Sequence, residues 1–176
     1  MEIEKAALQD AVLGQDFLTW LWFKSEKNGW LFKLKDGEEI NVFLEQKVSV
    51  RGGEGENAET ATVSGPHSEF NEARQGLRTG KRVDKALLRF ERDGNTWFVG
   101  IKAQDLSLNA LRTPKVETRL EEGDDPDAPL LEKLFLVEQC SNFIDELYEQ
   151  FLTLRLSVSW VDELRDFAEW LEAVEK

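Results

Sequence analysis

Two Asp-Gly dipeptides, each between runs of alternating apolar and polar residues, constrain the fold more than any other feature of the sequence. Asp36-Gly37 separates residues 30–34 from residues 40–50, and Asp93-Gly94 separates residues 81–92 from residues 96–103. Asp-Gly between alternating runs is a strong signal for a β-hairpin, because the tight turn needs residues that accept positive φ. The sequence therefore predicts two hairpins and an antiparallel sheet.

Helical periodicity surrounds the predicted hairpins. Apolar residues recur every three or four positions over residues 4–26, 68–79, 129–156 and 160–174. A further short strand is predicted near residues 60–63, where β-branched residues gather. The fold class predicted is α+β: an antiparallel sheet of hairpins with helices packed on one face and a long C-terminal helical segment.

The domain organisation predicted from these patterns is a single core built from two segments. Residues 1–120 form the sheet domain, residues 121–128 an acidic linker that contains Pro126 and is followed by Pro129, and residues 129–176 a helical segment packed on the same core. The long helix of this last segment either covers the core or forms a dimer arm.

Cysteine content and hydropathy favour a cytoplasmic protein without a membrane segment. Cys140 is the one cysteine, and its apolar surroundings favour a small buried hydrophobe over a reactive thiol. The longest apolar stretch near the start, residues 17–23, is far too short to span a membrane.

Catalytic and metal-binding motifs are missing from the sequence, so we expect neither an enzyme nor a cofactor. His67 is the one histidine and favours a surface loop, since metal sites need several such ligands. The acidic residues 121–127 lie in the linker and are expected to be solvated. A nuclease that uses carboxylates and a divalent metal is the weakest of the functional hypotheses.

Charge is distributed unevenly along the chain, whose formal net charge is −13. Between residues 74 and 92, seven bases stand against two acids. Long cationic side chains on a strand can reach phosphates, and Lys85 and Arg89 are predicted to share a strand face with Val83 and Leu87. The other interpretation is a solvated sheet face that the acidic C-terminal helices neutralise. The residues predicted to contact DNA phosphate are Arg74, Arg78, Lys81, Arg82, Lys85, Arg89 and Arg92.

Three aromatic residues of the first predicted helix, Trp20, Trp22 and Phe23, cannot all face the same side. Two interpretations stay open. The helix is buried on more than one side, or part of it meets a partner chain, so that these three residues form an oligomer interface.

The basic segment resembles the C-terminal half of RdgC, a bacterial recombination-associated protein family. The resemblance rests on Gly80-Lys81-Arg82-Val83-Asp84-Lys85-Ala86-Leu87-Leu88, on the strand TWFVGI, on the acidic linker with the long helix after it, and on FLTWLWF at residues 17–23. It spans roughly residues 14–156. Gly80, Lys81 and Lys85 correspond to motif positions of the family.

Membership of this family would imply a homodimer that encircles or lies along double-stranded DNA without reading its sequence. It would also imply a role in limiting recombinase loading, a recombinase-related protein partner and a place with the nucleoid. The main functional hypothesis is therefore a non-catalytic DNA-associated protein. The alternative is a homo-oligomeric protein-interaction module that does not bind DNA.

Overall fold

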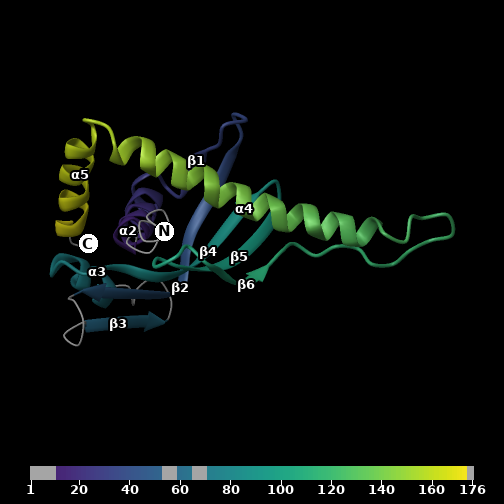
Figure 1. Cartoon of the computed structure of the whole chain (residues 1–176), viewed down its shortest axis with the longest axis horizontal. Coiled ribbons are helices and arrows are strands. Elements are labelled where there is room, and N and C mark those ends of the chain that lie inside the picture. Colours follow the sequence, from purple (N-terminus) through teal and green to yellow (C-terminus); the bar gives the residue numbers. More distant parts are fainter. Residues whose placement is uncertain (1–10, 53–58, 65–70, 174–176) are drawn as a thin grey trace, which may run out of the picture.

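A computed structural model describes residues 11–52, 59–64 and 71–173 of the chain. In these ranges four helices and six strands follow the order α2, β1, β2, β3, α3, β4, β5, β6, α4, α5 (Figure 1). Their bounds are α2 Ala11–Lys27, β1 Leu31–Lys33, β2 Glu39–Gly52, β3 Glu59–Ser64, α3 Asn71–Arg78, β4 Arg82–Arg92, β5 Asn95–Lys102, β6 Leu108–Arg112, α4 Ala128–Arg155 and α5 Trp160–Glu172. The predicted start of the first helix, residues 4–10, and the predicted loop residue His67 lie outside the described residues.

All the strands pair in one antiparallel sheet. Its order is β1-β2-β4-β5-β6, and β3 pairs with β2 beside β1. Both predicted hairpins are confirmed: β1 pairs with β2 around Asp36-Gly37, and β4 pairs with β5 around Asp93-Gly94. Asp93 and Gly94 have φ values of 51° and 78°, as a two-residue hairpin turn requires. The fold is therefore α+β, as predicted.

A bulge in β4 changes which side chains share a face. Ser49 pairs with Lys85 and Val50 with Val83, so Asp84 is the extra residue on the β4 side. Val83 is fully buried, whereas Lys85 is exposed. The prediction that Val83 and Lys85 share a face is wrong, because the bulge interrupts the alternation between them.

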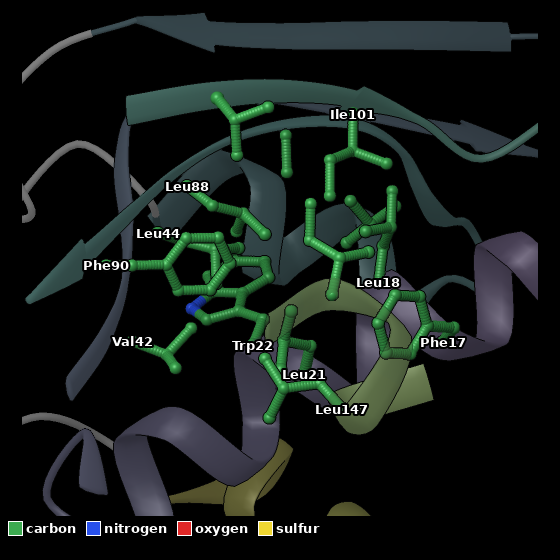
Figure 2. Close-up of a cluster of buried hydrophobic side chains, with 14 of the residues drawn as sticks. Phe17, Leu18, Leu21, Trp22, Val42, Leu44, Leu88, Phe90, Ile101 and Leu147 are labelled. Atoms are coloured by element: carbon green, nitrogen blue, oxygen red, sulfur yellow. The ribbon is translucent and has the colours of Figure 1, made fainter. Parts of the chain in front are cut away.

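The hydrophobic core lies between one face of the sheet and the helices α2 and α4. Figure 2 shows Leu88 and Phe90 from β4 directed toward Leu21 of α2 and Leu147 of α4. On the same sheet face, the rings of Trp97 and Phe143 meet edge to face at 5.2 Å between centroids. The opposite face of the sheet packs against neither of these two helices.

Helix α2 is enclosed on several sides, which decides between the two interpretations of its aromatic residues. Trp20, Trp22 and Phe23 are 5%, 1% and 1% exposed, so these side chains belong to the core of the chain itself. Helix α5 covers part of α2, with Phe23 against Phe167 at 5.6 Å between ring centroids. The expected oligomer interface is therefore not formed by these three residues, because α5 folds back over them.

Helix α4 has two parts with different surroundings. Its later turns pack on the core through buried residues such as Phe143 and Phe151. Its first turns project beyond the sheet together with residues 113–127 (Figure 1). Four large apolar side chains there are 55–59% exposed: Leu130, Leu131, Leu134 and Phe135. Residues 113–135 are called the α4 arm below. In the described ranges, no helix has the length and apolarity needed to cross a membrane.

Candidate nucleic-acid interface

The seven cations predicted to bind DNA do not lie on one surface. Arg74 and Arg78 belong to α3, Lys81 precedes β4, and the other four are distributed along β4. The eleven residues of β4 extend over about 35 Å. Six of the seven cations already form an ion pair or a hydrogen bond within the chain, and these contacts fix the positions of their side chains.

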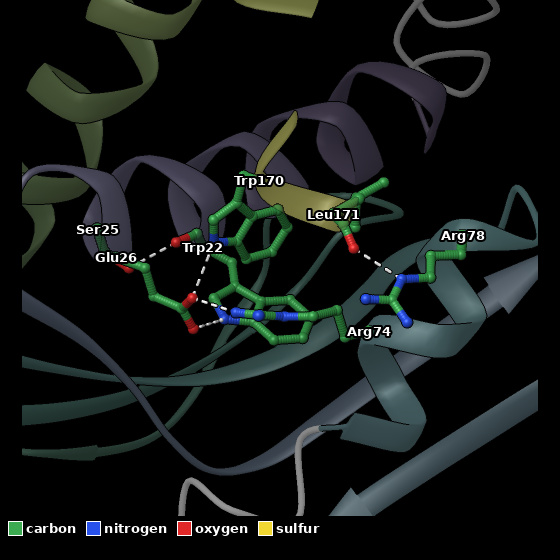
Figure 3. A network of polar contacts seen from close by, with 7 residues as sticks. All are labelled: Trp22, Ser25, Glu26, Arg74, Arg78, Trp170 and Leu171. Carbon is green, nitrogen blue, oxygen red and sulfur yellow. Dashed lines mark hydrogen bonds and ion pairs between the residues drawn. The ribbon is translucent and has the colours of Figure 1, made fainter. Parts of the chain in front are cut away.

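Arg74 has a structural environment. It is 8% exposed, and its guanidinium pairs with the carboxylate of Glu26 while lying 4.5 Å from the ring centroid of Trp170. The same carboxylate accepts hydrogen bonds from the indole Nε1 of Trp22 at 2.7 Å and of Trp170 at 2.9 Å (Figure 3). Three donors from α2, α3 and α5 thus converge on Glu26, so Arg74 joins these helices and is not available to phosphate.

Arg78, on the next turn of α3, holds the end of α5. Its Nε donates a hydrogen bond of 2.7 Å to the backbone carbonyl of Leu171 (Figure 3). A cation beside the last carbonyls of a helix interacts favourably with the helix dipole. Arg78 therefore acts as a capping group for α5.

Most of the remaining cations have carboxylate partners. Lys81 lies 3.1 Å from Glu59, and the Nε of Arg82 lies 3.8 Å from Asp16. Arg92 approaches Asp36 at 3.1 Å and Asp93 at 3.4 Å. Arg89 pairs with Glu45 and Glu91 and lies 4.0 Å from the ring centroid of Phe43. These pairs neutralise much of the charge that the sequence concentrates between residues 74 and 92.

Lys85 differs from the other six cations. Its side chain is exposed and has no ion pair within 4 Å in the described part of the chain. Directly opposite it on β5 lies Lys102, which is also exposed. Two residues before the β4 bulge, Arg82 lies directly opposite the exposed Arg51 of β2. Two like-charged cross-strand pairs thus occupy the same end of β4. Arg51, Arg82, Lys85 and Lys102 are called the cationic strand end below.

Sequence reasoning missed Lys102 and Arg51, because both lie outside the basic window of residues 74–92. A signal for Lys102 was present. A two-residue turn at Asp93-Gly94 fixes the register of the hairpin, and counting back from Arg92 opposite Asn95 brings Lys85 opposite Lys102. The pairing of Arg51 with Arg82 depends on the bulge in β4, so it could not be predicted by counting along a hairpin.

Carboxylates near the cationic strand end have shifted pKa values. Burial raises the pKa of Asp16 above its usual value, although Arg155 and Arg82 oppose this effect. A hydrogen bond from Ser107 lowers the pKa of Asp105, and the nearby charge of Lys102 contributes in the same direction. Asp105 is therefore an anion beside Lys102, but it lies beyond ion-pair distance in the described residues.

No described group of three or more His, Cys, Asp or Glu side chains could hold a metal ion. In the predicted linker, Asp124 and Asp125 accept backbone hydrogen bonds from Glu121 and Asp127, at 2.8 and 2.9 Å. These carboxylates shape local turns. Comparison of the chain with protein-family models, with curated proteins and with solved structures finds no match.

Proposed function

We propose that this chain binds the phosphate backbone of double-stranded DNA through the cationic strand end, without catalysis and without reading base sequence. The observation that supports the proposal is the pairing of Lys85 with Lys102 directly across the β4–β5 ladder. Like charges at such positions destabilise a sheet. A phosphate bound between them would remove this repulsion, so the pair is better suited to an anionic ligand than to an isolated sheet.

The number of available cations sets the expected character of binding. Arg51, Lys85 and Lys102 are exposed and have no ion pair within 4 Å among the described residues. Arg82 already forms an ion pair with Asp16, so it is not counted among the available cations. Three phosphate contacts are few, and the net charge of −13 repels a polyanion at longer range. Binding should therefore be weak at physiological salt and much stronger at low salt.

Sequence independence follows from the groups involved. Lysine and arginine contacts to phosphate position a protein on DNA and carry no direct information about base sequence. The resemblance to RdgC proteins adds the expectation of a role in recombination and of a place with the nucleoid in the cytoplasm.

A charge-matched comparison tests this proposal. Binding of a fluorescein-labelled duplex is measured by anisotropy at low salt for the wild-type chain and for Lys85→Gln/Lys102→Gln. The control is Lys27→Gln/Lys35→Gln, which removes the same charge from two lysines that already pair with Asp166 and Glu149. We expect about tenfold weaker binding for the first variant and a small change for the control. Equal losses in both variants, or a wild-type chain that does not bind, would reject the proposal.

A second candidate function, self-association, is favoured by the α4 arm. Contiguous exposed apolar surface is typical of protein–protein contacts, and Leu130, Leu131, Leu134 and Phe135 provide it on one projecting helix. The arm also carries charges of both signs. Residues 115–133 of the arm hold three bases and seven acids, so the charges of two arms repel and the apolar patch has to supply the attraction. A two-fold contact would cover the same apolar side chains on both copies, so the proposed occupant is a second copy of this chain.

Light scattering tests self-association directly. We expect a dimer at tens of micromolar protein and a monomer for Leu134→Glu, which introduces a charge into the apolar patch. The control is Val158→Glu, because Val158 is 93% exposed in the connection between α4 and α5 and lies outside the arm. A monomeric wild-type chain, or a dimer that survives Leu134→Glu, would rule out the arm as the interface.

A further inference from the structure

A row of aromatic rings and guanidinium groups crosses the face of the sheet that is not packed against α2 and α4. Phe43 of β2 lies opposite Arg89 of β4, Arg89 lies opposite Phe98 of β5, and Phe98 lies opposite Arg112 of β6. Because the residues are cross-strand partners, their side chains share one face. Trp30 extends the row beyond β2. These five residues are called the aromatic row below.

The contacts within the aromatic row are between flat groups. The rings of Trp30 and Phe43 are stacked, with centroids 5.7 Å apart and planes 27° from parallel. The guanidinium carbon of Arg89 lies 4.0 Å from the ring centroid of Phe43, and that of Arg112 lies 5.7 Å from the ring centroid of Phe98. Phe43 and Phe98 are separated by two strand spacings, or about 9.5 Å.

Exposure and charge show what the row offers to a ligand. Trp30 is 43% exposed, Arg112 is exposed, and Phe43 and Phe98 are partly exposed. The charge of Arg89 is neutralised by Glu45 and Glu91, so Arg89 contributes a planar surface more than a net charge. The aromatic row is thus a flat π surface with little net charge of its own, although the whole chain is strongly acidic.

The aromatic row and the cationic strand end belong to the same two central strands. Lys85 lies four residues from Arg89 on β4, and Lys102 lies four residues from Phe98 on β5, so about 13 Å separates the two features. Leu87 and Gly100 form the sheet between them, and the side chain of Asn109 lies against Gly100. A flat surface for rings therefore continues, along the strands, into a surface for anions.

We propose that the aromatic row is a stacking platform for the bases of single-stranded nucleic acid, whose backbone continues toward Lys85 and Lys102. Single-stranded nucleic acids bind proteins by stacking bases on aromatic side chains while cations follow the backbone, and such binding tolerates many sequences. Duplex DNA keeps its bases inside the stack and cannot use the row. This inference rests on the proposed function for the phosphate contacts and adds the class of nucleic acid that the site binds best.

The experiment compares strands that differ only in their bases. Anisotropy titrations at low salt use a labelled twelve-nucleotide oligothymidine strand, an abasic strand of the same length and a duplex. We expect the wild-type chain to bind oligothymidine at least about fivefold more tightly than the abasic strand, which is the lower bound for stacking one base. Phe98→Leu should remove this preference and leave abasic-strand binding and its salt dependence unchanged. Thermal unfolding of Phe98→Leu checks that the fold is retained.

The control is Val158→Ala, which truncates an exposed apolar side chain outside both the aromatic row and the α4 arm and should keep the preference. Equal binding of oligothymidine and abasic strands by the wild-type chain, with duplex binding intact, would reject the stacking platform and leave the proposed function standing. A preference that survives Phe98→Leu would place stacking elsewhere and also reject it. Oligothymidine binding without duplex binding would support the platform and reject the duplex proposal, and a chain that binds none of the three would reject both.

Discussion

Replacing Glu26 by glutamine should destabilise the fold strongly, although Glu26 is on no predicted site. Its carboxylate is the common acceptor for Arg74, Trp22 and Trp170, and it joins α2 to α3 and α5. Glutamine keeps one acceptor oxygen but brings an amide that cannot accept. It also removes the negative charge that compensates Arg74, whose side chain is 10% exposed.

The size of the effect follows from these contacts. Removing one member of a buried ion pair costs about 3–5 kcal/mol, because an uncompensated charge stays behind. The side chain of Glu26 is 27% exposed, so water offsets part of that cost, and we expect about 3 kcal/mol. For a domain of this size the loss corresponds to a decrease in Tm of about 6–12 °C.

Urea denaturation followed by tryptophan fluorescence measures the free energy of unfolding of the wild-type chain, Glu26→Gln, Arg74→Met and the double variant. The double variant should lose less stability than the two single losses combined, since neither charge is then left alone. Glu149→Gln is the control, because Glu149 pairs with Lys35 at the surface, and it should change little. A loss for Glu26→Gln as small as that of the control would refute the structural assignment of Arg74.

Three further predictions concern the packing and protonation of the core. Gly14→Ala should destabilise the fold by about 1–3 kcal/mol in thermal unfolding, because a Cβ there would lie 1.9 Å from the carbonyl oxygen of Ala103; an unchanged or higher Tm would contradict this contact. Cys140 should not react with a maleimide in the native state, since burial raises the pKa of its thiol to about 12, and rapid labelling without denaturant would show a different core. The pKa of Asp16, measured by NMR, should lie above 3.8 and should rise further in Arg155→Met, because the variant loses a charge that lowers it. A raised pKa means that the folded state holds the proton more tightly than the unfolded state, so the stability that Asp16 contributes is fully present below the unfolded pKa and is lost as pH rises through the folded pKa. A fall in the Asp16 pKa in the variant would contradict the assigned cause.

Local patterns predicted most of the architecture. The Asp-Gly turns and the alternation on both sides of them indicated the hairpins, and helical periodicity placed α4 within one residue of its observed start. Strand β6 was not predicted, because it is short and Ala110 has a φ of 51°, which interrupts regular alternation. The bulge at Asp84 was not predicted either, since a bulge depends on the pairing of two strands and not on one strand alone.

The candidate site was predicted less well, for a physical reason. A count of bases along the chain finds charge but cannot find its neutralisation, which depends on residues distant in sequence. Arg74 meets Glu26 and Trp170, and Arg89 meets Glu45, only after the helices and strands have packed. Lys102 was accessible to prediction because the hairpin register fixes its partner Lys85.

The salt dependence of duplex binding tests the central claim most directly. If the exposed cations Arg51, Lys85 and Lys102 bind phosphates, the logarithm of the observed association constant should fall linearly with the logarithm of salt concentration, with a slope of about −2.7. A slope near zero would show that no phosphate is neutralised. A slope of about −6 would show that all seven cations between residues 74 and 92 contact DNA, contrary to the ion pairs that hold most of them within the fold.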